Sequence, residues 1–109
     1  MEVEYYYWTG TFNTVLESLN RSIAQYIRHH KKVKIGITND PVRRARQHTK
    51  TRHNWDYMKV KYKTSSVNYV NQLERLLIDN YMDYLTNEIR GGGGPKGEGY
   101  QYLYVLLKK

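Results

Sequence analysis

The chain has 109 residues and no cysteine, which allows one domain with one core and excludes disulfides, zinc–thiolate sites and thiol chemistry. Its 18 Lys and Arg residues against 10 Asp and Glu residues give a formal net charge of +8, which favours a polyanionic partner. No apolar run approaches the roughly 18 residues that span a bilayer, and no signal peptide opens the chain. We therefore expect an intracellular protein that binds nucleic acid and not a membrane.

The first predicted element is a strand over residues 4–9, which is rich in tyrosine and ends at a glycine. Alternation along a strand places Tyr5 and Tyr7 on one face and Tyr6 on the other. Tyrosine stacks on bases and bonds phosphates, but it also fills strands, so most of the 12 tyrosines are expected to be structural.

An amphipathic helix is predicted next. Residues 14–17 (Thr-Val-Leu-Glu) have the form of a capping box, and the basic run 28–32 closes the helix where its dipole favours positive charge. The apolar positions between them recur at helical spacing. They are Val15, Leu16, Leu19, Ile23, Tyr26 and Ile27.

The central segment reads as a strand, a turn and a short helix. Residues 33–37 (Val-Lys-Ile-Gly-Ile) alternate as in a half-buried strand. Asp40 is predicted to cap a helix whose first residue is Pro41, where proline's fixed φ fits. In that helix Arg44 and His48 lie one turn apart and share a face. The segment therefore presents an arginine and a histidine together.

A third strand is predicted over residues 58–64, because apolar and lysine positions alternate there. One face would carry Met58, Val60, Tyr62 and Thr64, and the other Lys59, Lys61 and Lys63. Two interpretations of the lysine face stay open. It is either a solvated face that protects an edge strand or a stripe that contacts phosphates.

Ser65 or Ser66 is predicted to cap a helix that runs to about Leu85. Its helical projection places Glu74 in the middle of the apolar stripe. A buried carboxylate is costly unless it is paired or protonated. It either pairs with a core arginine or tyrosine, or lines a site and binds a divalent metal through oxygen. We favour the metal site.

The glycine-rich run 91–99 follows, either as a flexible connector or as backbone that approaches a phosphodiester closely. Residues 100–107 alternate as a last strand. The order β-α-β-α-β-α-β predicts a single α+β domain over residues 1–109. Its sheet is expected to be small, mostly antiparallel and three- to four-stranded, with flanking helices.

These motifs together resemble the GIY-YIG nuclease superfamily. In that family a strand glycine is followed eight residues later by an arginine and one helical turn later by a histidine, as Gly36, Arg44 and His48 are here. The family's metal-binding glutamate stands on the helix after the third strand, and Glu74 occupies that place. The helical projection singled out Glu74 without reference to the family.

The family's first motif, Gly-Ile-Tyr, falls by this resemblance on the first tyrosine-rich strand, although its glycine and isoleucine are missing. We align Tyr7 with the motif tyrosine and keep Tyr6 as the alternative. Lys34 occupies the place of the second-motif tyrosine. The family's two motif strands usually pair through a short hairpin, whereas a helix separates them in this chain.

The resemblance implies a metal-dependent endonuclease that hydrolyses DNA phosphodiester bonds. Glu74 would hold Mg²⁺ or Mn²⁺, and Arg44 would bind the scissile phosphate. Tyr7 would orient or deprotonate the attacking water, a role that His48 could share. A cation at Lys34 would favour the phenolate, because tyrosine ionises only near pH ~10.

We also predict residues that contact the nucleic acid. They are Arg43, Gln47, Lys50, Arg52, Asn87 and Lys96. The sequence does not decide whether the DNA is single- or double-stranded. We expect the protein to be a monomer or a weak dimer. One alternative is a catalytically inactive nucleic-acid-binding module on the same fold. Another is a structural or partner-binding domain in which Arg44 and Glu74 form only an internal ion pair.

Overall fold

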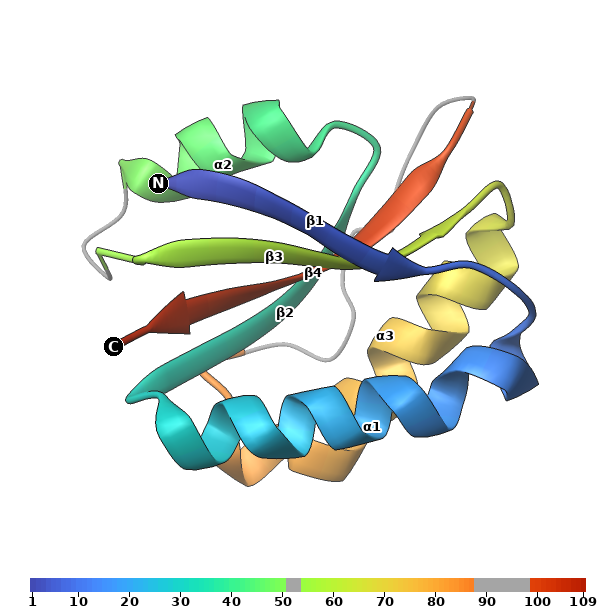
Figure 1. Ribbon diagram of the computed structural model, residues 1–109, viewed down its shortest axis with the longest axis horizontal. Helices are drawn as coiled ribbons and strands as arrows, with labels where there is room; N and C mark the ends of the chain where they lie inside the picture. The colour runs from blue at the N-terminus through green and yellow to red at the C-terminus, as the bar shows by residue number, and fades with distance from the viewer. Residues whose placement is uncertain (51–53, 88–98) are drawn as a thin grey trace.

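The computed structural model describes residues 1–50, 54–87 and 99–109 (Figure 1). In chain order its elements are β1 (Glu2–Trp8), α1 (Phe12–His29), β2 (Lys32–Thr38), α2 (Pro41–Thr49), β3 (Tyr57–Thr64), α3 (Val67–Tyr81), the 3₁₀ turn η1 (Met82–Tyr84) and β4 (Gln101–Lys108). The predicted α+β class and element order are confirmed. No helix in the described part of the chain is long and apolar enough to cross a membrane.

The four strands form one mixed sheet in the order β1-β3-β4-β2. β4 pairs antiparallel with both β2 and β3, and β1 pairs parallel with β3. The sheet is therefore mostly antiparallel, as predicted. The last strand of the chain lies inside the sheet, and the first strand lies at the edge that is farthest from β2.

The sheet separates two layers of helices, with α2 on one face and α1 and α3 on the other (Figure 1). The face toward α1 and α3 buries the larger core, which includes Leu19, Ile23, Ile35, Leu73, Leu77 and Leu103. The face toward α2 buries a smaller one, formed by Ala45, Trp55, Met58, Val60, Tyr104 and Leu106. Burial of these side chains is the main favourable contribution to folding.

The predicted capping box at the start of α1 does not form. The helix begins at Phe12 with Thr11 at its N-cap, three residues before the predicted cap, so Thr14 lies inside its first turn. The Thr14 hydroxyl donates to the carbonyl of Thr11 at 2.8 Å, and Glu17 forms an ion pair with Arg21 at 2.6 Å. The glutamate therefore supports the helix through an i,i+4 pair and does not reach back to its start.

The predicted caps of the other two helices are confirmed. The Asp40 side chain accepts a hydrogen bond from the backbone N–H of Arg43 at 3.1 Å, with Pro41 at the first helical position. The Ser66 hydroxyl accepts from the backbone N–H of Tyr69 at 3.1 Å. Both caps satisfy a donor that the first helical turn leaves free. They fix where α2 and α3 leave the sheet.

A bulge in β3 changes the faces that alternation predicts. The register with β4 shifts between Val60 and Tyr62, so one extra residue is inserted in β3. Met58 and Val60 pack toward α2, whereas Tyr62 packs in the core beneath α1 and α3. The prediction of a single face through these residues is therefore wrong beyond Val60.

The three lysines of β3 do not form a solvated face. Lys59 pairs with Glu4 of β1 at 2.8 Å. Lys61 is buried, with its ammonium 4.8 Å from the centre of the Trp8 ring. Lys63 is half-buried and lies among tyrosine rings. The prediction of a solvated lysine face is therefore wrong. Of the three lysines, only Lys63 is placed where it could contact a phosphate.

The open edge of β2 is closed by a side chain. Asn87 accepts a hydrogen bond from the backbone N–H of Ile35 at 3.0 Å and donates to the Ile35 carbonyl at 2.8 Å. Its amide thus takes the place of a neighbouring strand. Asn87 therefore has a structural role at this edge, and its contact with nucleic acid stays a prediction.

The pairing of β2 with β4 places Tyr104 directly opposite Gly36. The Tyr104 ring fills the space that a side chain on Gly36 would occupy. A Cβ built on Gly36 would lie 2.3 Å from the ring's Cζ atom and from its hydroxyl oxygen. Only glycine at this position allows the Tyr104 ring to cross β2.

We expect Gly36→Ala to lower the free energy of unfolding by about 1–3 kcal/mol, the usual range for overpacking. The reason is that the Tyr104 ring is 2% exposed, packs in the smaller core, and has its hydroxyl bonded to His48, so moving the ring would disrupt these contacts. The measurement is urea denaturation, followed by the change in the unfolding midpoint at constant slope.

A double-mutant cycle controls for other effects of the methyl group. In a Tyr104→Ala background the space is empty, so Gly36→Ala should cost little there. An equal loss of stability in both backgrounds would show that the contact does not exist.

Candidate active site

Helix α2 presents the predicted arginine and histidine on the same side. Ala45 is 4% exposed and packs toward the sheet, which fixes the rotation of the helix about its axis. Arg44 and His48 flank this buried position and are half-buried themselves. As their spacing predicts, the Arg44 and His48 side chains reach the same region above β2 and β4.

Tyr104 of β4 meets both of these side chains. Its hydroxyl lies 2.9 Å from Nε2 of His48, within hydrogen-bond distance, and the two rings are in tilted contact at 5.8 Å. The guanidinium of Arg44 also hydrogen-bonds the Tyr104 hydroxyl. The phenol oxygen is therefore held by a cation and an imidazole, which fixes its position over Gly36.

The surroundings of Tyr104 decide its protonation. Burial raises the pKa of the Tyr104 phenol above its ordinary value near 10, and the charge of Glu74 raises it further. The charge and hydrogen bond of Arg44 act in the opposite direction. Burial is the largest of these effects, so Tyr104 is a neutral phenol at pH 7 in the free protein. It can donate a hydrogen bond and exchange its proton with His48.

Glu74 of α3 lies on the buried side of its helix, as the helical projection predicts. Its residue is only 6% exposed. Burial raises the pKa of the Glu74 carboxyl from 4.5 to about 7, although the positive charges of Arg44 and Arg75 lower it in part. The carboxyl is thus balanced between its neutral and charged forms near neutral pH.

Four side chains from three distant segments therefore form one site. We call Arg44, His48, Glu74 and Tyr104 the Tyr104 site. The sequence predicted the first three, and the spacing of the arginine, histidine and glutamate was sufficient to find them. It missed Tyr104, because the alternation of tyrosines in the last strand does not reveal which strand lies beside β2.

The structure does not bring Tyr6 or Tyr7 to this site. Both stand on β1, which pairs only with β3 and is separated from β2 by two strands. Tyr6 is 70% exposed, and the Tyr7 ring lies 5.7 Å from the ammonium of Lys63. The first motif is aligned with β1 because a tyrosine-rich strand stands at the start of the chain, as it does in the family. In the structure it is β4, not β1, that pairs with the glycine strand β2.

Lys34 lies on β2 opposite Leu106, on the same face as Gly36. The charged groups that act on the Tyr104 phenol are Arg44 and Glu74. Burial raises the pKa of that phenol, so Tyr104 is not ionised in the free protein. The predicted role of Lys34, which was to favour the phenolate of Tyr7, stays a prediction.

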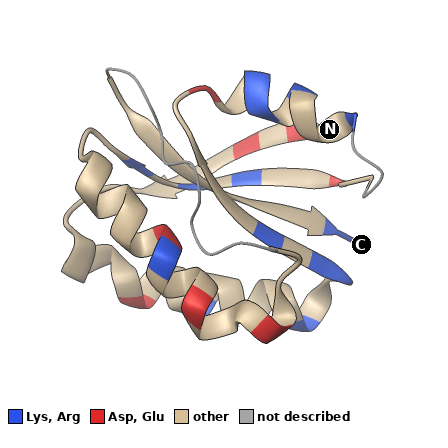
Figure 2. Cartoon of the chain, turned by 180° about the vertical axis from the view of Figure 1, so that it is seen from behind, with Lys and Arg blue, Asp and Glu red and all other residues tan. Residues whose placement is uncertain are grey.

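Three of the predicted nucleic-acid contacts lie on the open side of α2. Arg43, Gln47 and Lys50 are exposed there, beside the Tyr104 site. Figure 2 shows Lys and Arg positions along this helix and on the strands next to it. Arg52 and Lys96 lie outside the described residues. The charge on α2 fits a polyanion that passes over the site.

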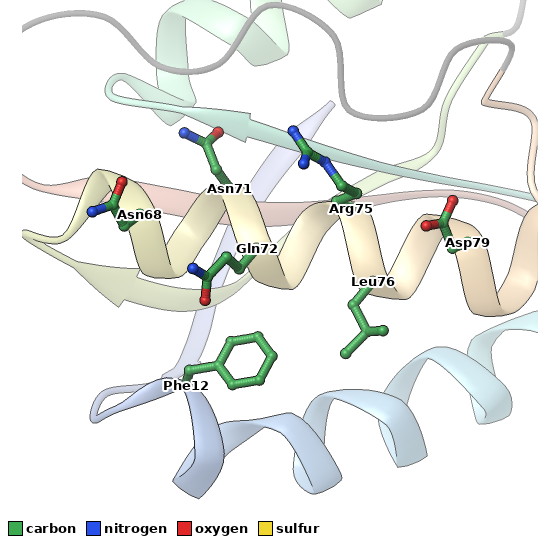
Figure 3. Close-up of a pocket in the computed structure, with 7 residues that line it drawn as sticks. All are labelled: Phe12, Asn68, Asn71, Gln72, Arg75, Leu76 and Asp79. Atoms are coloured by element: carbon green, nitrogen blue, oxygen red, sulfur yellow. The ribbon is translucent and has the colours of Figure 1, made fainter.

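A separate hollow of about 540 Å³ lies between α1 and α3. Figure 3 shows its lining, in which Phe12 and Leu76 face each other beneath a row of amides and Arg75. Asn68, Asn71 and Gln72 supply the amides. Asp79 lines the hollow as well, but the described residues of the lining include no histidine or tyrosine that could share a proton with it, so we assign the chemistry to the Tyr104 site. Arg75 still matters there through its charge beside Glu74.

The buried carboxyl predicts how stability changes with pH. Between pH 4.5 and about 7 the folded protein keeps a proton on Glu74 that the unfolded chain has lost, so this group makes the fold less stable as pH rises. The slope from one such group is at most about 1.4 kcal/mol per pH unit. Glu74→Gln should remove this loss and be more stable than the native protein at pH 8.

The measurement is urea denaturation at several pH values in the presence of EDTA. Glu17→Gln is the matched control, because it changes an exposed carboxylate on α1 and should leave the pH profile as it is. If the free energy of unfolding of Glu74→Gln changed with pH between 5 and 8 in the same way as that of the native protein, the prediction that Glu74 is buried and ionisable would be wrong.

Comparison with known proteins adds one finding. Searches of curated proteins and of solved structures gave no match. A family model, the T5orf172 domain, matches residues 22–103. This range contains Arg44, His48 and Glu74, ends inside β4, and leaves out β1. The domain is associated with endonuclease-related proteins and indicates a nuclease-like or DNA-binding role. The match covers more than half of the chain, which therefore belongs to the T5orf172 domain family.

Proposed function

We propose that this chain is an endonuclease of the GIY-YIG type that hydrolyses DNA phosphodiester bonds with Mg²⁺ or Mn²⁺. The observation that carries the proposal is the convergence of Arg44 and His48 of α2 with Glu74 of α3 and Tyr104 of β4. The family match and the net charge of +8 support a nucleic-acid substrate.

The strand order supports the same family pattern with a changed connection. The GIY-YIG pattern pairs a tyrosine strand with the glycine strand. Here the strand that pairs antiparallel with β2 is β4, with Tyr104 opposite Gly36. We infer that β4 supplies the motif tyrosine as Tyr104. The resemblance in sequence places this tyrosine at Tyr7, or alternatively at Tyr6.

The residues present fit a divalent metal that is completed by the substrate. Among the described residues, no group of three or more His, Asp or Glu side chains could hold an ion. Glu74 is the carboxylate of the Tyr104 site and would bind the metal there. Mg²⁺ commonly takes one or two protein carboxylates and fills its other positions with water and substrate phosphate oxygens. The charges of Arg44 and Arg75 only partly offset the cost of burying the Glu74 carboxylate, so a bound cation would stabilise its charged form.

When bound, the metal would polarise the phosphate and stabilise the leaving 3′-oxygen. Arg44 would hold the non-bridging oxygens of the scissile phosphate and stabilise the charge that grows there. The Tyr104 hydroxyl would orient the attacking water. As the water loses a proton to Tyr104, the phenol proton would pass to Nε2 of His48 across their 2.9 Å contact.

A catalytically inactive binding module is the second candidate. The observation that favours it is Lys34, which stands where the family pattern has its second tyrosine. Glu74 favours the enzyme, because a protein that only binds phosphates gains nothing from a carboxylate in its site. Cleavage experiments separate the two functions.

We expect labelled single- or double-stranded DNA to be cut in Mg²⁺ or Mn²⁺ and left intact in EDTA. Glu74→Gln should abolish cutting, because the amide keeps the shape and loses the negative charge that binds the metal. The control Glu17→Gln should cut like the native protein. Binding of both DNA forms without cutting in either metal would identify the inactive module.

A second variant tests the assignment of the tyrosine. Tyr104→Phe removes one hydroxyl and should lower the rate of cutting by roughly 10²- to 10⁴-fold, the usual contribution of a general acid–base group. Tyr6→Phe makes the same chemical change on the exposed strand β1 and should leave the rate unchanged. The reverse result would return the role to β1. Rates are measured under single-turnover conditions at equal DNA occupancy.

A further inference from the structure

An exposed aromatic surface lies beside the Tyr104 site and takes no part in it. Tyr5, Tyr7 and Tyr100 are 46%, 39% and 55% exposed. Tyr102 of β4 lies beside them and is half-buried. Exposed aromatic side chains that gather in one place mark a binding surface more often than single ones do. We call these four tyrosines with Lys63 the aromatic track.

A cation lies in the middle of these rings. The ammonium of Lys63 is 4.2 Å from the centre of the Tyr100 ring, 5.7 Å from that of Tyr7 and 6.0 Å from that of Tyr102. Lys63 thus holds the rings together by cation–π attraction while its charge remains available at the half-exposed surface. The surface therefore offers π faces and a positive charge in the same place.

The track adjoins the Tyr104 site. Tyr102 precedes Tyr104 by two residues on β4, so both lie on the same face of the sheet, roughly 7 Å apart along the strand. Tyr102 pairs with Lys63 of β3. It is also near Tyr5 of β1, whose pKa is raised by burial and further by the neighbouring Tyr102 phenol. Figure 1 shows that the end of β1 and the start of β4 extend beyond the part of the sheet that α2 covers.

We propose that the aromatic track binds the unpaired bases of a single-stranded nucleic acid, whose backbone then enters the Tyr104 site. This inference rests on the proposed nuclease function and assigns the substrate class. Aromatic side chains that stack on bases, combined with cations along the backbone, are the usual means of binding single strands. A duplex keeps its base faces inside its own stack, so exposed rings gain little from it.

The charge in the track decides between this occupant and a protein partner. An apolar partner would have to bury the ammonium of Lys63 without a counter-ion, which is unfavourable. A phosphate of the single strand supplies that counter-ion directly. The net charge of +8 favours the same partner.

The test measures binding in EDTA, so that it does not depend on cleavage. A fluorescein-labelled single-stranded oligonucleotide and a duplex of the same sequence are titrated at one fixed salt concentration, because affinity depends on salt. The native protein should bind the single strand more tightly. Tyr7→Ala combined with Tyr100→Ala should weaken single-strand binding by about tenfold or more and leave duplex binding unchanged.

Two further variants sharpen the result. Tyr84→Ala removes a ring that is 67% exposed on η1, outside the track, and should not change either affinity. Lys63→Gln should weaken single-strand binding and reduce its salt dependence. Equal binding of single strand and duplex by the native protein, or unchanged single-strand binding by the double variant, would overturn the proposal.

The outcome is separable from that of the nuclease proposal. If single-strand binding depends on the rings but no DNA is cut, the proposal for the aromatic track is supported and the nuclease proposal is contradicted. If DNA is cut and the Tyr7 and Tyr100 variants do not change this, the nuclease proposal is supported and the proposal for the aromatic track is contradicted. Should the double variant instead convert a dimer into a monomer at unchanged single-strand affinity, the surface would be an interface between copies of the chain.

Discussion

The contact between Gly36 and Tyr104 determines the geometry of the whole site. Because Gly36 has no side chain, the Tyr104 ring crosses β2 and its hydroxyl reaches His48 and Arg44 of the helix that follows β2. The same strand pairing sets the distance between β4 and α2. The outer edge of β2 is fixed by Asn87, which bonds both backbone groups of Ile35. The glycine strand is therefore held from both sides, which keeps the hydroxyl in place.

Burial dominates the electrostatics of the site. Arg44 lowers the pKa of both Glu74 and Tyr104, but burial raises both values by more. Near pH 7 the free site thus contains a permanently charged guanidinium, a neutral phenol and a carboxyl that is only partly ionised. Since the positive charge of Arg44 is only partly balanced by the carboxyl of Glu74, the site favours an anionic ligand. If Glu74 binds a divalent metal as proposed, the phosphate of the substrate would supply the oxygen ligands that a single carboxylate lacks.

The features that sequence predicted correctly depend on neighbours a few residues apart. The caps at Asp40 and Ser66, the pairing of Arg44 with His48 on one helix face and the buried position of Glu74 all follow from helical periodicity and local hydrogen bonds. Strand order does not, because it is decided by packing between residues far apart in the chain. Both β1 and β4 carry tyrosines, so the sequence alone does not show which strand lies beside β2. The pairing of β4 with β2 places Tyr104 in the site. The bulge after Val60 changes the face of the sheet to which the following residues of β3 point, and the alternating sequence pattern does not predict it.

The strand order also explains why β1 can carry so many exposed rings. β4 lies between β3 and β2, so the last segment of the chain supplies both a central strand and the phenol of the site. β1 joins the sheet only through a parallel pairing with β3 and contributes no side chain to the Tyr104 site. Its aromatic residues are therefore not required to pack around Arg44 or Glu74. This strand is free of that constraint and is separated from β2 by two other strands of the same sheet, so its exposed rings are available for the proposed binding of nucleic acid.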